Sequence, residues 1–305
     1  MNSRRENASN PARAVDRLAT LLGAGVPIST CWRLLAESAP EDAVLAAADA
    51  ASERGDPVGS AITDASASCS LQNRTAWAAT AAAVAVAESA GAPLSAALEV
   101  VSERLRSIEE TGREIAVAMA GPRMTMRLVM AMPVLSILGS TVLGFDALGT
   151  LIGDPYGRVA GVTGLLLLVL GALWGRRLSR RAQPRRLAPG FSLELVAIAV
   201  RGGGALEQAC RSVEEECQRH SLPFDRDAIE DCLRLADRAG APVAGLLRAE
   251  AALIRAVVGA EDRTRAAALG VTLLLPLGVC VLPAFMLLAI APTILAVVAS
   301  TLAGF

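Results

Sequence analysis

One short stretch occurs twice in this chain of 305 residues, and it constrains the fold more than any other feature. Glu88-Ser-Ala-Gly-Ala-Pro-Leu94 returns 149 residues later as Asp237-Arg-Ala-Gly-Ala-Pro-Val243. In each copy the glycine suits the end of one helix, and the proline suits the first turn of the next. A long helical pattern and then an uncharged apolar segment follow both copies. The repeat therefore predicts two related helical modules, each joined to a membrane segment.

Composition supports a membrane protein with sizeable aqueous parts. The chain is 53% hydrophobic, with a mean hydropathy of +0.46, which is too apolar for an ordinary soluble protein. Charged residues make up 19%, which is too many for a wholly embedded protein. The net charge of −1 gives no argument for binding nucleic acid. We therefore expect an all-α membrane protein that does not bind nucleic acid.

The first module is expected at 14–122, after a polar and disordered N-terminus at 1–13 in the cytoplasm. It begins with helical hairpins that glycine and proline punctuate, and it ends with a long helix from Pro93. Apolar residues recur in that helix at intervals of three and four, with charged residues between them, as in an amphipathic helix. The apolar set is Leu94, Leu98, Val101, Leu105, Ile108 and Ile115.

Apolar runs predict about three membrane spans. The first two are expected at 123–147 and 158–175. An arginine-rich linker at 176–191 follows them, and because arginine marks the cytoplasmic side, it places both modules in the cytoplasm. The uncharged segment 266–305 is too long for one upright span. We expect it to form a helix that enters the membrane and a third span with an external C-terminus, and a hairpin of two short spans is the alternative.

The second module, at 192–265, is expected to be a shortened copy of the first. Gly202–Gly204 take the place of Gly23–Gly25 in its opening hairpin. The offset between the copies is 179 residues at this hairpin and 149 later, so the second module lacks about 30 residues. The missing part corresponds to the third and fourth helices of the first module.

No group of residues points to catalysis, a cofactor or a metal. Cys210, Cys217 and His220 suggest a metal site, but their spacing matches no zinc pattern, so packed thiols are the preferred interpretation. His220 is the single histidine and lies in a polar stretch, so we expect a solvated loop residue. Without an acid/base pair, a nucleophile with its base or a phosphate loop, we expect no enzyme.

The order of the motifs resembles the F domain of type II secretion and type IV pilus platform proteins. The resemblance rests on Leu21-Leu22-Gly-Ala-Gly25-Val-Pro27, on Ala87-Glu88-Ser-Ala-Gly91-Ala-Pro93-Leu94 and on Met132-Pro133-Val-Leu135. The closest likeness is to the tight-adherence (Flp) pilus proteins TadB and TadC. Residues 88–175 look like the TadB end, and Leu193 to about Pro292 looks like TadC. The chain departs from these proteins in carrying both halves and in its shortened second module.

This resemblance implies a multi-pass platform protein of the inner membrane, with two cytoplasmic F-type bundles. Its implied partners are a hexameric assembly ATPase, pilin subunits, other platform subunits in a homo- or hetero-oligomer, and the lipid bilayer. The ATPase would drive the extraction of pilins into a growing filament. The first candidates for residues that face the ATPase or another partner lie on the charged face of the amphipathic helix, and they are Glu103, Arg104, Glu109, Glu110 and Arg113. The alternative is that this charged face is simply solvated.

Two other classes of function remain as alternatives. A transporter or channel for a small solute, built from two repeats, would need polar or ionisable residues at mid-membrane. The predicted spans offer only a few serine and threonine hydroxyls there. A membrane enzyme would need the acid/base pair that the sequence lacks.

Overall fold

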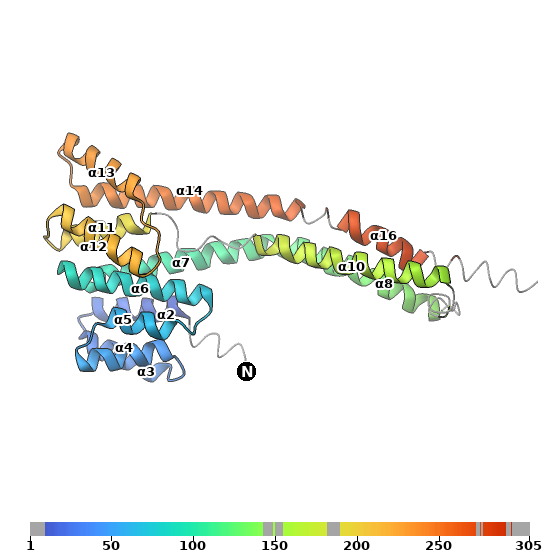
Figure 1. Cartoon of the computed structure of the whole chain (residues 1–305), viewed down its shortest axis with the longest axis horizontal. Coiled ribbons are helices and arrows are strands. Elements are labelled where there is room, and N and C mark those ends of the chain that lie inside the picture. Colours follow the sequence, from blue (N-terminus) through green and yellow to red (C-terminus); the bar gives the residue numbers. More distant parts are fainter. Residues whose placement is uncertain are drawn as a thin grey trace, which may run out of the picture. The chain divides into compact units, whose positions relative to one another are not determined.

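The structure is a computed structural model that describes residues 10–142, 149, 155–181, 190–272, 275, 277–290 and 294. All regular elements in these residues are helices, labelled as in Figure 1. The helices are α2 (Pro11–Gly23), α3 (Ile28–Ser38), α4 (Ala43–Arg54), α5 (Val58–Ser66), α6 (Leu71–Ala90), α7 (Leu94–Ala118), α8 (Ala120–Val142), α10 (Pro155–Arg181), α11 (Phe191–Arg201), α12 (Leu206–Arg219), α13 (Arg226–Ala239), α14 (Val243–Thr272), η1 (Leu277–Val281), α16 (Leu282–Phe285) and η2 (Met286–Ile290).

The described residues divide into two compact units. The first combines the residues up to Thr111 with those from 190 to Ala260, and the second combines Gly112 to 181 with those from Glu261 onward. Helices α7 and α14 each contribute residues to both units. The predicted first module therefore joins most of the predicted second module in one unit.

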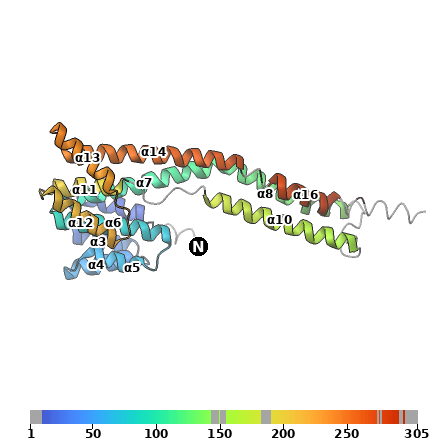
Figure 2. The ribbon, with the colours of Figure 1, turned by 45° about the horizontal axis from the view of Figure 1, so that its top comes forward.

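Helix α6 is the centre of the first unit. It packs against α5 and α2 and against α11 and α12, which lie on opposite sides of it in Figure 1, and Figure 2 shows the same helices turned by 45°. Its alanine-rich sequence is buried around most of its circumference, as expected for a helix that lacks a polar face. A Cβ on Gly59 of α5 would lie 3.0 Å from the carbonyl oxygen of Ala81, so α5 approaches α6 closely.

A single hydrophobic core holds the helices of both predicted modules. Trp32, Trp77, Phe191, Leu195 and Leu247 are among its large, fully buried side chains. The prediction of two bundles did not anticipate this shared core. The second module has no counterpart of α4 and α5, and instead α6 of the first module covers its hairpin of α11 and α12.

The two modules follow the same order of turns. In the first, Gly25 after the hairpin helix and Gly91 after α6 have φ values of +84° and +64°. In the second, Gly203 and Gly240 have φ values of +90° and +63° at the corresponding turns, so Gly25 corresponds to Gly203, with an offset of 178 rather than the expected 179 residues. Glycine is favoured in this left-handed region because it has no Cβ. The helix stops predicted at Gly91 and Gly240 are thus confirmed.

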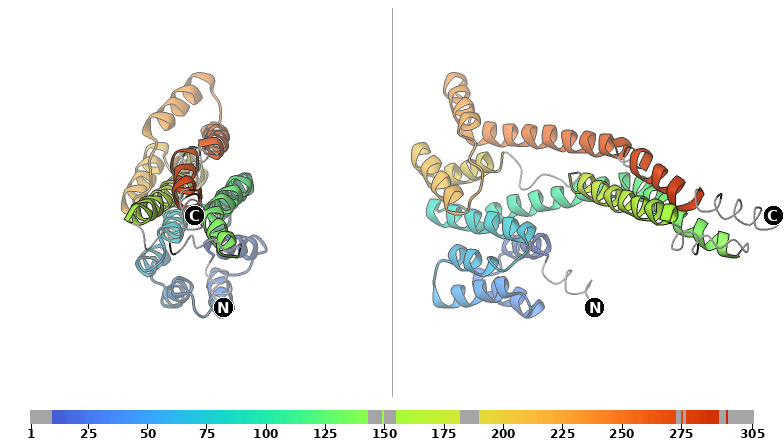
Figure 3. Two further views of the ribbon diagram at one scale, coloured as in Figure 1. Left: turned by 90° about the vertical axis from the view of Figure 1, so that its right-hand side faces the viewer. Right: turned by 45° about the vertical axis from the view of Figure 1, so that its right-hand side comes forward.

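The second unit is a bundle in which α10 and α8 both pack against the C-terminal helices η1, α16 and η2 (Figure 3). Glycines of α10 form the contact. A Cβ on Gly164 would lie 2.5 Å from Cγ of Leu288, and one on Gly171 would lie 3.1 Å from Cβ of Cys280. Glycine therefore permits a close helix approach, as in many membrane helix pairs.

Large apolar side chains are exposed along this second bundle. They include Leu128, Leu135 and Leu138 of α8, Leu165, Leu166 and Leu170 of α10, and Val279, Leu282 and Met286 of the C-terminal helices. So many exposed large apolar side chains are unfavourable in water and favour an apolar surrounding.

Among the described residues, the segment Gly157–Leu178 is the one that is long and apolar enough to cross a membrane, and Gly278–Leu288 is a shorter apolar segment. The span predicted at 158–175 lies within the first of these. The span predicted at 123–147 and the segment 266–305 lie partly outside the described residues. The count of three spans therefore stays a prediction.

Candidate functional site

The structure separates the five residues predicted to face a partner. Glu103 and Glu110 are exposed on α7 in the first unit, and Arg113 is exposed in the second unit. Glu109 is half-buried, and its Oε1 accepts a hydrogen bond of 2.8 Å from Nδ2 of Asn10. Arg104 is only 3% exposed. Within the first unit, Glu103 and Glu110 alone keep the exposed position that the sequence suggested.

The expectation that Arg104 lies on an exposed face is wrong for a specific reason. Its side chain turns into the core, where Nε donates a 2.9 Å hydrogen bond to Oε2 of Glu194. Burial, together with the nearby charge of Arg255, lowers the pKa of Arg104 to about 9, and Glu103 opposes the shift. The guanidinium thus remains charged at neutral pH, and the ion pair offsets part of its loss of hydration.

Glu194 is the centre of a buried ion cluster. Its side chain is 5% exposed, and its second oxygen, Oε1, pairs with Nη1 of Arg255. One carboxylate therefore joins α11 to α7 and α14. Two cations share this anion, and Nη2 of Arg104 has no hydrogen-bond partner in the part of the chain that the structure describes. The cluster holds both modules together and is a structural element rather than a docking surface.

The first module contains a matching but exposed pair. Asp16 of α2 pairs with Arg106 of α7, and Oγ of Ser102 donates a 2.9 Å hydrogen bond to Oδ1 of Asp16. Asp16 lies nine residues before left-handed Gly25, and Glu194 lies nine residues before left-handed Gly203. Arg106 and Arg255 each lie 15 residues after the left-handed glycines Gly91 and Gly240. Both modules thus tie their first helix to their last through an acid and an arginine at corresponding positions.

Another ion pair lies in the second unit. Nε of Arg263 on α14 donates to Oε2 of Glu114 on α7 at 2.6 Å. Next to it, Ile115, Met119 and Leu178 form a small buried cluster with Leu269. These contacts hold α7, α10 and α14 together in that unit.

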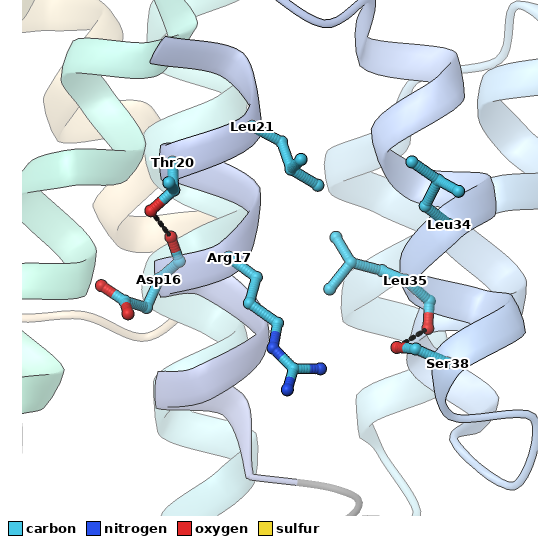
Figure 4. Close-up of a pocket in the computed structure, with 7 residues that line it drawn as sticks. All are labelled: Asp16, Arg17, Thr20, Leu21, Leu34, Leu35 and Ser38. Atoms are coloured by element: carbon cyan, nitrogen blue, oxygen red, sulfur yellow. Dashed lines mark hydrogen bonds between the residues drawn. The ribbon is translucent and has the colours of Figure 1, made fainter. Parts of the chain in front are cut away.

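A groove of about 300 Å³ lies between α2 and α3 in the first unit. Figure 4 shows Leu21 of α2 and Leu35 of α3 directed toward each other across it, with the guanidinium of Arg17 entering from α2. Asp16 is also among the lining residues, but its carboxylate is directed away from α3, toward the ion pair with Arg106. Leu34 of α3 also lines the groove and is 45% exposed. The groove therefore offers apolar surface beside a positive charge.

His220 is buried rather than solvated, contrary to the sequence-based expectation. It is 8% exposed at the end of α12, and its Nδ1 lies 3.1 Å from Oγ1 of Thr63 on α5. Its Nε2 lies 3.3 Å from Oε2 of Glu216. Burial lowers the pKa of His220 more strongly than nearby Glu216 raises it. The polar stretch around His220 concealed a contact between the two modules.

No three histidine, cysteine or acidic side chains come together as metal ligands within the described residues. Cys217 is buried, which raises the pKa of its thiol to about 12. Because metals bind the thiolate, this protonated thiol is a poor ligand at neutral pH. The packed-thiol interpretation suits Cys217 better than the metal site considered for Cys210, Cys217 and His220.

Comparison with known proteins addresses the first half of the chain. Residues 14–139 match the family of type II secretion system (T2SS) protein F. The matched range runs from α2 into α8, and so it includes the groove, the pair between Asp16 and Arg106, and the exposed glutamates of α7. No curated protein and no solved structure matched the chain.

The match supports the resemblance to F domains and a general role in a secretion or pilus platform. It covers 126 residues, counted from 14 to 139, which is less than half of the chain. The likeness to the tight-adherence branch is a finer statement that this match does not resolve.

Sequence reasoning missed Glu194, although a signal for it exists. In the helix Phe191–Arg201, the residues before the terminal arginine are apolar except for Glu194 and one serine. A lone carboxylate within an apolar helix predicts a buried charged partner, since an unpaired buried charge is strongly unfavourable. The identity of that partner was not accessible, because Arg104 lies 90 residues away in the chain.

Proposed function

We propose that this protein is an inner-membrane platform subunit of a machine that assembles a type IV-like filament, of the tight-adherence pilus or type II secretion kind. In this role it couples a cytoplasmic assembly ATPase to the extraction of pilins from the bilayer. The observation that carries the proposal is the match of residues 14–139 to T2SS protein F. The exposed apolar surface of the second unit supports it, because such a surface suits the lipid interior.

Helices α7 and α14 are the proposed connection between the ATPase and the membrane segments. Each is long, at 25 and 30 residues, and each contributes to both units. A helix transmits displacement along its axis because its backbone hydrogen bonds are internal. The buried cluster around Glu194 would make α7 and α14 move together, since one carboxylate binds arginines from both.

The first experiment tests the role itself. Deleting the gene is expected to abolish surface filaments or secretion of a filament-dependent substrate, and the wild-type gene is expected to restore them. Electron microscopy of the cell surface and immunoblots of sheared filaments provide the readout. Filaments that persist at wild-type numbers after deletion would contradict the platform role.

The second experiment tests the ATPase contact. Glu103 and Glu110 lie seven residues apart on one face of α7, and both are exposed. Reversal of both charges to arginine is expected to reduce co-purification of the ATPase with the full-length protein in detergent. Glu207→Arg is the matched control, because that carboxylate is highly exposed on α12 and pairs with Arg211 only at 3.7 Å. Equal recovery of the ATPase from all variants would exclude this face as the contact.

A further inference from the structure

The groove between α2 and α3 has features of a docking site for a helix. Its volume of about 300 Å³ is at the lower end of the range for ligand pockets. Leucines from both helices line it. Leu35 is already buried, and a third helix laid along the hairpin would also bury Leu21 and Leu34, as in other complexes where an apolar helix face fills a groove. The groove is large enough for an anchoring side chain rather than for a large cofactor.

The charges at the groove select the chemistry of that helix. Arg17 lines the groove, and Arg13 lies one turn before it on α2. Both are exposed, and neither forms an ion pair with any residue that the structure describes. On α3, exposed Arg33 and Glu37 offset each other in formal charge.

The acid beside Arg17 does not neutralise it. The carboxylate of Asp16 already pairs with Arg106 and accepts a hydrogen bond from Ser102, both on α7. Figure 4 shows that this carboxylate and the guanidinium of Arg17 leave α2 in different directions. The groove thus keeps a positive balance beside its apolar floor.

We propose that the α2–α3 groove binds an acidic amphipathic helix of a partner protein, with a large apolar residue in the groove and a carboxylate one turn away against Arg17. Charge complementarity argues for this occupant, because a carboxylate can pair with an otherwise unpaired arginine. The partner belongs to the filament-assembly machine, and in this respect the inference rests on the proposed function. The contact is distinct from the acidic face at Glu103 and Glu110, which would attract a basic surface.

Photo-crosslinking in cells tests the proposal. A benzophenone amino acid replaces Leu34 at the groove in the full-length protein, and the same replacement at Leu71 of α6, which is 56% exposed, is the control. We expect a protein crosslink from position 34 that is at least about tenfold stronger than from position 71. Mass spectrometry is expected to map it to a helix with a carboxylate one turn from a large apolar residue.

Charge exchange then tests the ion pair. Arg17→Glu is expected to reduce the crosslink about tenfold or more, since like charges in contact are repulsive. Arg17→Lys is expected to retain it, and Arg74→Glu, the same change at an exposed position of α6, is expected to leave it unchanged. Replacing the mapped acidic residue of the partner by arginine should restore the crosslink in the Arg17→Glu variant. Circular dichroism should show equal melting for these exposed variants.

Several results would overturn the groove proposal. These are no crosslink above the Leu71 control, a crosslink to lipid or to another copy of this chain, a mapped segment without a carboxylate, or failure of the charge exchange.

The proposed function is tested separately from the groove. If gene deletion leaves filaments intact while position 34 still crosslinks to an acidic helix that passes the exchange, the groove stands and the platform role does not. If filaments are lost but position 34 gives no crosslink, the platform role stands and the groove does not.

Discussion

Neutralising Glu194 is expected to destabilise the protein much more than neutralising Asp16, although both pair with an arginine at corresponding positions. Glu194→Gln removes the anion that pairs with both Arg104 and Arg255 and leaves two cations near each other. Breaking a buried pair costs about 3–5 kcal/mol in the free energy of unfolding, because a charge is left buried without a partner. For a chain of 305 residues, with an unfolding entropy of about 2.1 cal/mol/K per residue, this corresponds to a decrease in Tm of about 5–8 °C.

Asp16→Asn is the matched control. The side chains of Asp16 and Arg106 are 43% and 59% exposed, so water replaces much of the lost interaction. Exposed pairs contribute about 0–1 kcal/mol, and we therefore expect a change in Tm of at most about 2 °C.

Thermal unfolding of the purified full-length protein in detergent, followed by circular dichroism, compares the two variants. Hydrogen exchange of the backbone amides in α11 shows whether the loss of stability is located at this helix. A double variant, Glu194→Gln with Arg104→Met, is expected to regain part of the stability, because an apolar side chain then replaces the unpaired buried cation. If the Glu194→Gln and Asp16→Asn variants have the same Tm, the buried cluster does not hold the modules together.

Three further predictions concern packing, pH and thiol reactivity. Gly164→Ala is expected to lower the free energy of unfolding by about 1–3 kcal/mol, because the added methyl group would overpack the contact between α10 and Leu288. The control Gly139→Ala should not lower it, because a Cβ there meets nothing within 4 Å. Equal Tm values for the two variants would contradict the close contact. Stability should fall as the pH drops below about 6.5, because the unfolded chain takes up a proton that buried His220 resists. His220→Gln should lessen this fall in denaturant titrations at pH 7.5 and 5.5, and identical pH profiles would refute it. Cys217 should resist maleimide at pH 7.5 because burial raises its pKa to about 12, whereas half-buried Cys69 should react sooner by mass spectrometry; faster labelling of Cys217 would be the contrary result.

Local features of the fold could be predicted from the sequence because their causes lie within a few residues. Gly91 and Gly240 end their helices with left-handed backbone, as their positions before Ala-Pro suggested. The amphipathic spacing of α7 correctly placed Leu98, Val101 and Leu105 in the core. These signals come from backbone sterics and from the periodicity of one helix.

Contacts between distant segments could not be predicted in the same way. The spacing of α7 places Arg104 among charged neighbours, and only Glu194, in another helix, explains its burial. His220 lies in a polar stretch, yet Thr63 of α5 lies 3.1 Å from it. Both side chains lie where the two modules share a core, and periodicity within one helix carries no information about such a partner. The prediction that all five candidate residues of α7 are exposed was therefore only partly correct.

The pair between Glu114 and Arg263 has a consequence for how such a platform is encoded. Both residues lie 23 positions after the left-handed glycine of their module, and they contact each other. If two identical polypeptides met at this position, glutamate would oppose glutamate or arginine would oppose arginine, and the meeting point would be repulsive. Joining the halves in one polypeptide allows the two positions to differ, so that the meeting point becomes attractive. Translation of a single message then supplies the unequal halves in a fixed one-to-one ratio.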